Sequence, residues 1–349
     1  MGIPRTYPMV VLGVVRLTGV LMVQPILRQL KIYGTEMVHF ARLRSMKRIT
    51  SPVPDDPNNR LRQLLQVLTD RIKGQLETLS RLVEAVSRQE FKAIPCAGSR
   101  GAFFFAGPTG VGKTYTAIIL ANEVCGPKRF VRFNCSEFKT LDAVARLLGD
   151  RAGDRGRFGQ AYSRVKDGVW LFDEIEKAHP EFVHLFLQMT DAGQLTLANG
   201  ETLDLSRIYI IVTSNLGSAE ILGREHLPFT SLERRVVSCI QRYLRPELLA
   251  RFGQPYVFRP LSREIQEEIA EQKMADLMLW QATQGRNITY DASVVRFIVQ
   301  RGFSPRLGAR PLLDTLHALV GNAIVENLRA GGNGSGVLVI DCNQLKLIS

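Results

Sequence analysis

The stretch Gly107-Pro108-Thr109-Gly110-Val111-Gly112-Lys113-Thr114 decides how the rest of this 349-residue chain is interpreted. It has the spacing G-x-x-x-x-G-K-[ST], follows an apolar run at residues 102–106 and precedes a helical pattern at 115–124. Glycines in this arrangement let backbone N–H groups surround phosphate at a helix N-terminus. A lysine placed like Lys113 reaches the β- and γ-phosphates of a nucleotide, and a hydroxyl placed like that of Thr114 holds Mg²⁺. The stretch therefore predicts a phosphate-binding loop built from all eight residues.

Short apolar runs, which are typical of β-strands, alternate with helical patterns from residue 102 onward. They are residues 102–106, 130–133, 169–172, 208–212 and 256–258. Such alternation favours a five-stranded parallel sheet covered by helices, which is an α/β fold. The hydrophobic content of 45% is sufficient to fill the core of such a fold.

The segments on either side of this region predict further domains. Apolar residues repeat at helical spacing in residues 61–72 and 76–86, and again past Pro260 in residues 264–280, 292–301 and 312–329, with two strand-like runs at 337–340 and 345–348. Three prolines with Asp and Asn favour an extended linker at residues 50–59. We therefore expect an N-terminal extension with its linker at 1–60, a large α/β domain at 61–260 and a small, mostly helical C-terminal domain at 261–349.

The net charge of +12 is concentrated in the N-terminal extension, since residues 1–63 carry +7. A basic segment of this kind can bind nucleic acid, anionic lipid or an acidic protein, or be a solvated surface, and composition does not choose among them. Polar residues such as Arg16 and Gln24 interrupt the apolar stretch at residues 9–27, and a spanning helix needs ~20 apolar residues. Packing on protein and contact with a membrane surface both remain open for this stretch.

The five cysteines are scattered and contain no C-x-x-C pair. This pattern predicts neither a disulfide framework nor a zinc site, and it is typical of a reducing compartment. We expect a cytoplasmic location, with membrane association through residues 9–27 as the open alternative.

Polar side chains follow two of the predicted strands. Asp173 and Glu174 end the apolar run at 169–172, which places Asp173 beside the metal and Glu174 where it could activate the attacking water. Asn215 ends the run that begins at residue 208, and its amide could hydrogen-bond that water or the γ-phosphate. Taken with the phosphate loop, these residues predict a site that binds and hydrolyses ATP with Mg²⁺.

Three further motifs follow the phosphate loop in order. They are Asp173-Glu174-Ile175-Glu176-Lys177-Ala178-His179-Pro180, Thr213-Ser214-Asn215-Leu216-Gly217 and Gly308-Ala309-Arg310-Pro311. With them, the chain from about residue 61 onward resembles the Clp-type AAA+ family, nearest the second ATPase module of its disaggregases. The resemblance implies a large ATPase domain with a small lid domain, a homo-hexameric ring and ATP-dependent protein remodelling.

The resemblance also implies roles for single residues. Ile72, Gly74 and Gln75 match the segment that lines the adenine pocket. Arg251 matches the arginine finger that enters the neighbouring subunit's site, and Arg310 matches the sensor-2 arginine of the lid. Asp173 would hold Mg²⁺ through water, and Thr114 would hold it directly.

The sequence departs from the family where its members grip substrate. The central-pore loop of the family contains an aromatic residue, whereas this chain has Gly153-Asp154-Arg155-Gly156, and Phe158 substitutes only if the loop register shifts. Charged side chains stay hydrated and favour specific partners over sequence-tolerant grip. Residues 193–200 match a second pore-facing loop. The tripeptide that docks the Clp-type peptidase has no counterpart, so we expect no such peptidase as partner.

Three functions therefore remain in competition. The first is a protein-remodelling chaperone, in line with the near-complete nucleotide site. The second is a torsin-like switch that acts on one dedicated protein partner without threading it, because of Asp154 and Arg155. The third is a nucleic-acid-handling ATPase of a mobile element or secretion system, which only the basic N-terminal extension favours.

Overall fold

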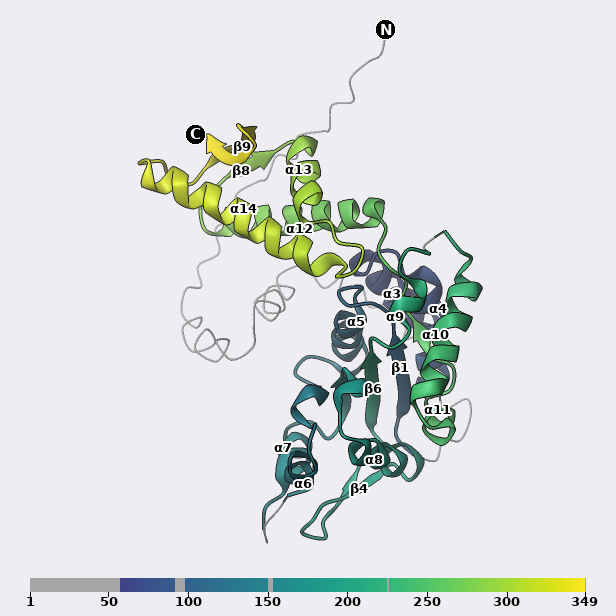
Figure 1. The fold of residues 1–349 in the computed structure, drawn as a ribbon. Coiled ribbons are helices and arrows are strands. Elements are labelled where there is room, and N and C mark those ends of the chain that lie inside the picture. Colours follow the sequence, from purple (N-terminus) through teal and green to yellow (C-terminus); the bar gives the residue numbers. More distant parts are fainter. Residues whose placement is uncertain (1–56, 92–97, 150–152, 225, 349) are drawn as a thin grey trace. The chain divides into compact units, whose positions relative to one another are not determined.

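A five-stranded parallel sheet forms the centre of the large α/β region, as the sequence predicts (Figure 1). The strand order is β2-β3-β6-β1-β7, and each neighbouring pair runs parallel. The strands are β1 (Gly101–Ala106), β2 (Phe130–Asn134), β3 (Gly168–Asp173), β6 (Ile208–Ser214) and β7 (Tyr256–Val257). Every residue of β3 and β6 is buried, which explains why both read as continuous apolar runs.

The computed structural model describes residues 57–91, 98–149, 153–224 and 226–348. These residues fall in one compact unit, Asp55–Ser349. The predictions for the basic N-terminal extension, including the apolar stretch at residues 9–27, lie outside the described residues. Within the described residues, no helix is long and apolar enough to cross a membrane.

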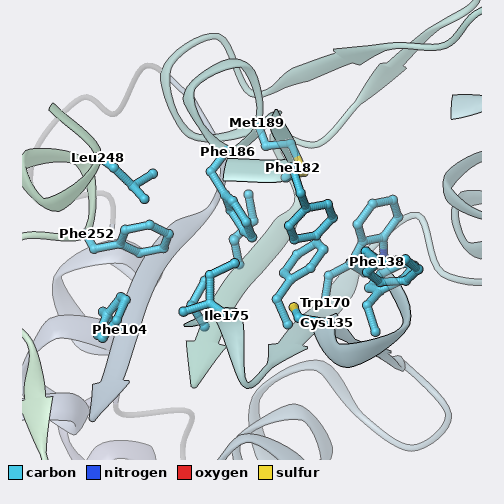
Figure 2. Close-up of a cluster of buried hydrophobic side chains, with 14 of the residues drawn as sticks. Phe104, Cys135, Phe138, Trp170, Ile175, Phe182, Phe186, Met189, Leu248 and Phe252 are labelled. Carbon is cyan, nitrogen blue, oxygen red and sulfur yellow. The ribbon is translucent and has the colours of Figure 1, made fainter. Parts of the chain in front are cut away.

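Helices cover both faces of the sheet because alternate strand residues point to opposite sides. On one face, Phe103 and Phe105 pack with the apolar sides of α3 (Pro57–Arg71), α4 (Leu76–Glu90) and α5 (Lys113–Leu120). On the other face, Phe104 belongs to a larger cluster with α6 (Leu141–Leu148), α7 (Gly156–Arg164), α8 (Pro180–Asp191), α9 (Ser218–Ile221), α10 (Phe229–Tyr243) and α11 (Pro246–Phe252). Figure 2 shows part of this cluster, where Phe186 of α8 meets Phe252 of α11 with ring centroids 6.0 Å apart.

Phe158 belongs to this second core. It is fully buried, and its ring stacks on Trp170 with an interplanar angle of 3°. The suggestion that Phe158 could serve as a pore aromatic is therefore wrong. The helical spacing of α7, which places Phe158 and Ala161 on one side, turns this ring toward the sheet.

The structure also differs from the sequence prediction in the linker. Helix α3 begins at Pro57, so the extended linker predicted through residue 59 is wrong for its last three residues; proline is well tolerated in the first helical turn.

A hairpin of β4 (Gln194–Thr196) and β5 (Thr202–Asp204) occupies the expected second pore-facing loop. Short one-turn segments complete this region: η2 (Ala121–Cys125), η3 (Cys135–Glu137) and η4 (Ile175–Lys177).

The C-terminal part combines three helices with a small sheet around its own core. The helices are α12 (Arg263–Thr283), α13 (Ala292–Gly302) and α14 (Ala309–Arg329), and the sheet has the order β10-β9-β8. Strands β9 (Gly336–Asp341) and β10 (Gln344–Ile348) form the predicted pair, whereas β8 (Ile288–Tyr290) was not predicted because three residues give no periodic signal.

Candidate functional site

The phosphate loop connects the end of β1 to the start of α5, where parallel strands and a helix N-terminus meet. Gly107 has φ 137°, and a Cβ there would lie 2.3 Å from the carbonyl oxygen of Phe258. Gly110 has φ 74°, and its Cβ would lie 2.1 Å from the carbonyl oxygen of Leu307. Any side chain at these two positions would collide with backbone, so both positions require glycine.

Lys113 is buried beneath this loop, with 7% of its surface exposed. Its ammonium donates hydrogen bonds to the carbonyl oxygens of Gly107 (2.5 Å) and Pro108 (2.6 Å) and to the side-chain oxygen of Asn215 (3.0 Å). All three acceptors are neutral. Burial lowers the pKa of Lys113 to about 8, against the opposing effect of nearby carboxylates, chiefly Asp173. The charge of this lysine is therefore poorly compensated, which suits it to bind an anion.

Asp173 and Thr114 face each other beside Lys113. The Thr114 hydroxyl lies 3.3 and 3.4 Å from the two carboxylate oxygens of Asp173. The hydroxyl of Thr213 and the guanidinium of Arg132 also donate to this carboxylate. A hydroxyl and a carboxylate oxygen are ligands that Mg²⁺ prefers, so the residues present fit a nucleotide-bound magnesium ion.

Glu174 lies next to this pair in a left-handed backbone conformation, with φ 60°. Its carboxylate accepts hydrogen bonds from the Asn215 amide at 3.3 Å and from Lys177 at 2.6 Å. A non-glycine residue rarely adopts this conformation, and such strain concentrates at functional sites. The side chain is about one-third exposed, so the carboxylate is accessible to water.

Asn215 links the phosphate loop to the acidic residues. Its oxygen accepts from Lys113 and, at 3.4 Å, from Thr109, while its nitrogen donates to Glu174. Glu176 fixes this residue by accepting from its backbone N–H at 3.1 Å and from its side-chain amide at 3.2 Å. The predicted loop and metal residues and two of the predicted catalytic residues, Glu174 and Asn215, thus come together in one hydrogen-bonded cluster.

Arg310 lies in the first turn of α14, whose N-terminus contacts the phosphate loop. The backbone N–H of Ala309 donates to the carbonyl oxygen of Gly110 at 3.0 Å. The positive charge of Arg310 contributes to the lowered pKa of Lys113, so the two cations act on the same region. Two helix N-termini, those of α5 and α14, therefore converge on the loop, and both favour a bound anion.

The three residues expected at the adenine pocket lie at the junction of α3 and α4. Ile72 is buried, with a side-chain carbon 3.3 Å from where a Cβ of Gly112 would stand. Gly74 has φ 74° and faces Ile265 of α12. Gln75 is 1% exposed, and its amide exchanges hydrogen bonds of 2.8 and 3.0 Å with the backbone of Arg259. Ile72 thus borders the loop directly, whereas Gln75 fixes the backbone at residue 259.

Arg251 lies outside this cluster. Its guanidinium forms an ion pair of 2.7 Å with Asp191 at the end of α8, and both side chains are well exposed, at 48% and 38%. The next residue, Phe252, is buried against Phe104 and Phe186, which fixes the end of α11. The structure therefore presents Arg251 at the surface on a rigid base.

The two expected pore-facing segments are tied to each other. Arg155 donates to both carboxylate oxygens of Glu201 in the β4–β5 hairpin, with its Nε at 2.6 Å, and to the hydroxyl of Ser163 at 2.5 Å. The backbone N–H of Ala198 donates to the carbonyl oxygen of Leu148 at 3.0 Å. Arg155 is thus held by its own chain.

Sequence reasoning assigned no role to four residues that complete these arrangements: Arg132, Glu176, Asp191 and Glu201. Glu176 stands within a quoted motif, and its spacing from Glu174 could have suggested a partner for Asn215. Arg132 carried a weaker signal, a charged residue within an otherwise apolar strand. Asp191 and Glu201 act over long separations in the sequence, and no local pattern reveals them.

Comparison with known proteins agrees with this geometry. A family model described as an AAA domain of the Cdc48 subfamily matches residues 99–254, and one described as the C-terminal D2-small domain of ClpB matches residues 261–339. The chain belongs to the Clp-type AAA+ ATPases. This Clp-type AAA+ chain is 34% identical to the chaperone protein ClpB of Vibrio cholerae, over 78% of its length and 33% of the relative's. It is also 34% identical to heat shock protein 100 of Trypanosoma brucei brucei, over 72% of its length and 30% of the relative's. The chain thus spans about a third of the length of these curated relatives.

Solved structures of Hsp104 share the fold of this Clp-type AAA+ chain. The Saccharomyces cerevisiae Hsp104–ADP complex matches with a TM-score of 0.74 and 25% identity, covering 84% of this chain and 53% of that chain. A closed-state reconstruction of Hsp104 with ATPγS and FITC-casein matches with a TM-score of 0.73 and 27% identity, covering 85% and 53%. The predicted α/β fold with a C-terminal lid region is therefore confirmed.

Proposed function

We propose that this chain is an ATP hydrolase that uses the energy of hydrolysis to remodel proteins, as a Clp-type chaperone. The observation that carries the proposal is Lys113, a buried ammonium at a helix N-terminus whose acceptors among the described residues are all neutral. The charge of such a group is stabilised most when the anionic phosphates of a nucleotide reach it. The two Hsp104 structures, which were solved with ADP and with ATPγS, support adenine as the base.

The remaining roles in this proposal follow from position and charge. Thr114 and Asp173 would hold Mg²⁺, Thr114 directly and Asp173 through water, and the metal would neutralise charge on the phosphates. Glu174 would accept a proton from the attacking water, with its carboxylate held by Asn215. Arg310 would contact the phosphates from α14, and the segment that contains Ile72, Gly74 and Gln75 would border the adenine.

The proposed active form is a homo-hexameric ring. Arg251 lies exposed on a rigid base and outside the cluster around Lys113, which suits a residue that enters the site of a neighbouring copy. A guanidinium supplied in this way stabilises charge on the transferring phosphoryl group. We propose domain boundaries near residues 60 and 260, so that each ring subunit contributes a large ATPase domain and a small lid domain.

The proposed substrate is protein. Hsp104, with which this chain shares its fold, has been solved together with casein. Here the segment around Asp154 and Arg155 is bound to Glu201 and offers no exposed aromatic ring among its described residues, so grip would depend on charge and backbone contacts. A dedicated or narrow set of protein partners fits this chemistry better than sequence-tolerant binding.

Hydrolysis and substrate capture test the two halves of the proposal. We expect Mg²⁺-dependent ATP hydrolysis by the purified chain, a loss of at least about 100-fold in Glu174→Gln, and retained nucleotide binding in that variant. Glu181→Gln, which removes an exposed carboxylate from the first turn of α8, is the matched control and should hydrolyse ATP normally. The ATP-bound Glu174→Gln variant should retain a protein partner in a pulldown. Unchanged hydrolysis in Glu174→Gln would refute its role, and ATP-independent capture would refute ATP-driven remodelling.

A further inference from the structure

Three side chains surround the carboxylate of Asp173 with hydrogen-bond donors. One oxygen accepts from the Thr213 hydroxyl, the other accepts from the Arg132 guanidinium, and the Thr114 hydroxyl lies 3.3 and 3.4 Å from the two. The Asp173 side chain is 9% exposed. An ionised carboxylate has about four lone-pair sites, so these contacts leave little capacity for another partner.

Arg132 reaches this carboxylate from the edge of the sheet. It lies in β2, whose register pairs Asn134 with Asp173, so Arg132 and Asp173 share one face of two neighbouring strands. Phe130 on the same face packs with the cluster under α5, whereas Phe133 points into the opposite core. The Arg132 side chain is 46% exposed, so its guanidinium covers Asp173 from the solvent side.

A divalent cation and this guanidinium compete for the same oxygens. Whether Asp173 contacts Mg²⁺ directly or through a metal-bound water, the carboxylate must supply a lone pair. Arginine has five donors and no acceptor, and it stays charged at any physiological pH. Its presence beside the metal would add repulsion between like charges, to which the nearby ammonium of Lys113 also contributes.

We propose that Arg132 is a positioning residue that holds Asp173 in the nucleotide-free subunit and leaves it when the divalent cation enters with the nucleotide. The inference rests on the proposed function, because the cation is that of the bound nucleotide. The Arg132 side chain is 46% exposed, so its guanidinium has solvent to move into when it leaves the buried carboxylate. Arg132 therefore raises the cation concentration at which the site fills and keeps free metal from occupying an empty site.

The test measures metal binding rather than turnover. The fluorescence of mant-ADP reports nucleotide binding while Mg²⁺ is titrated, and the electron paramagnetic resonance of Mn²⁺ reports binding of the metal alone. We expect Arg132→Met to lower the Mg²⁺ midpoint by at least ~2-fold, because even a fully exposed ion pair contributes that much, and to bind Mn²⁺ without nucleotide more tightly than the wild type. Arg132→Lys keeps the charge, so its Mg²⁺ midpoint should lie between those of Arg132→Met and the wild type.

Two further variants separate this role from a general effect on charge or folding. Arg129→Met removes an exposed arginine that pairs with Asp167 at the other end of β2, and it should keep the wild-type midpoint. Arg132→Gln repeats the neutral substitution with a polar side chain and should match Arg132→Met. Denaturant unfolding of each variant identifies any that has lost its fold.

The outcomes distinguish this inference from the function on which it rests. Wild-type protein that binds no mant-ADP at any Mg²⁺ concentration would overturn the nucleotide site itself. Normal mant-ADP binding with equal midpoints in the wild type, Arg132→Met and Arg132→Gln would overturn only the role of Arg132. A higher midpoint in the two neutral variants would likewise overturn it, because Arg132 would then assist the metal.

Discussion

The ammonium of Lys113 donates a hydrogen bond of 3.0 Å to the side-chain oxygen of Asn215, which joins the phosphate loop to the end of β6. Because the same amide donates to Glu174, Asn215 links the proposed phosphate-binding group to the proposed water-activating group. A phosphate that reaches Lys113 must compete with neutral acceptors only. Because the Asn215 amide is neutral, it leaves the charge of Lys113 free to bind phosphate.

Replacing Asn215 with aspartate should weaken nucleotide binding more than replacing it with alanine. Asn215→Asp places an anion against Lys113, so the lysine is neutralised before nucleotide arrives, and a charge-assisted hydrogen bond lost on binding corresponds to about 10- to 100-fold in affinity. Asn215→Ala leaves Lys113 with its two carbonyl acceptors and should bind nucleotide nearly as well as the wild type while hydrolysing it slowly. Mant-ADP titration of both variants checks the order, and equal affinities would contradict it.

Nucleotide affinity should fall as pH rises through the pKa of Lys113. Burial sets this pKa at about 8 in the nucleotide-free protein, and phosphate binding favours the charged form, so binding above this pH must take up a proton. Affinity at pH 9 should be roughly 10-fold weaker than at pH 7, because the protonated fraction falls by that factor. Calorimetric titration in two buffers of different ionisation enthalpy measures the proton uptake at each pH. A flat profile would show that Lys113 stays charged throughout.

The lowered pKa of Lys113 should make the stability of the fold rise with pH, whereas nucleotide affinity should fall. The folded pKa lies below the ordinary lysine value of 10.5, so the unfolded chain binds the proton more tightly. Burial of Lys113 therefore destabilises the fold by about 3 kcal/mol below pH 8, and this destabilisation is relieved as pH rises from 8 to 10.5. Function thus retains a residue that the nucleotide-free fold disfavours.

Removing the guanidinium of Arg251 should abolish turnover without unfolding the subunit. Its ion pair with Asp191 is well exposed, so Arg251→Ala should change the free energy of unfolding by less than about 1 kcal/mol. Wild-type ATPase activity per subunit should rise with protein concentration, and this rise should be missing in Arg251→Ala. Arg242→Ala removes an exposed arginine that pairs with Glu220 and is the matched control. Full activity in Arg251→Ala would contradict an arginine supplied to a neighbour.

Replacing Phe158 with alanine should destabilise the ATPase region. The ring is fully buried against Trp170 and Phe133, so its loss leaves a cavity that costs about 3–5 kcal/mol. Phe91→Ala removes a ring that is 44% exposed and should change stability far less. Denaturant unfolding of the two variants decides between a core residue and a surface contact. Equal stability of the two variants would contradict the assignment of Phe158 to the core.

The sequence predicts what local pattern controls and misses what distant residues decide. The phosphate loop and the five strands follow from glycine spacing and continuous apolar runs, and each lies within two residues of its predicted position. The ion pair of Arg155 with Glu201 joins residues 46 apart, and the contact of Arg132 with Asp173 joins residues 41 apart. Both contacts depend on which strands and loops become neighbours in the fold. The sequence alone therefore predicts no more for such a charged residue than a solvated surface position.

The hydrogen bond from Ala309 to Gly110 has a mechanical consequence. Gly110 has no room for a side chain beneath the carbonyl of Leu307, so the loop and the start of α14 meet backbone to backbone. No flexible side chain separates the start of α14 from the loop at the point where the phosphates would bind. A displacement of α14 would therefore reach the phosphate loop through backbone contacts alone.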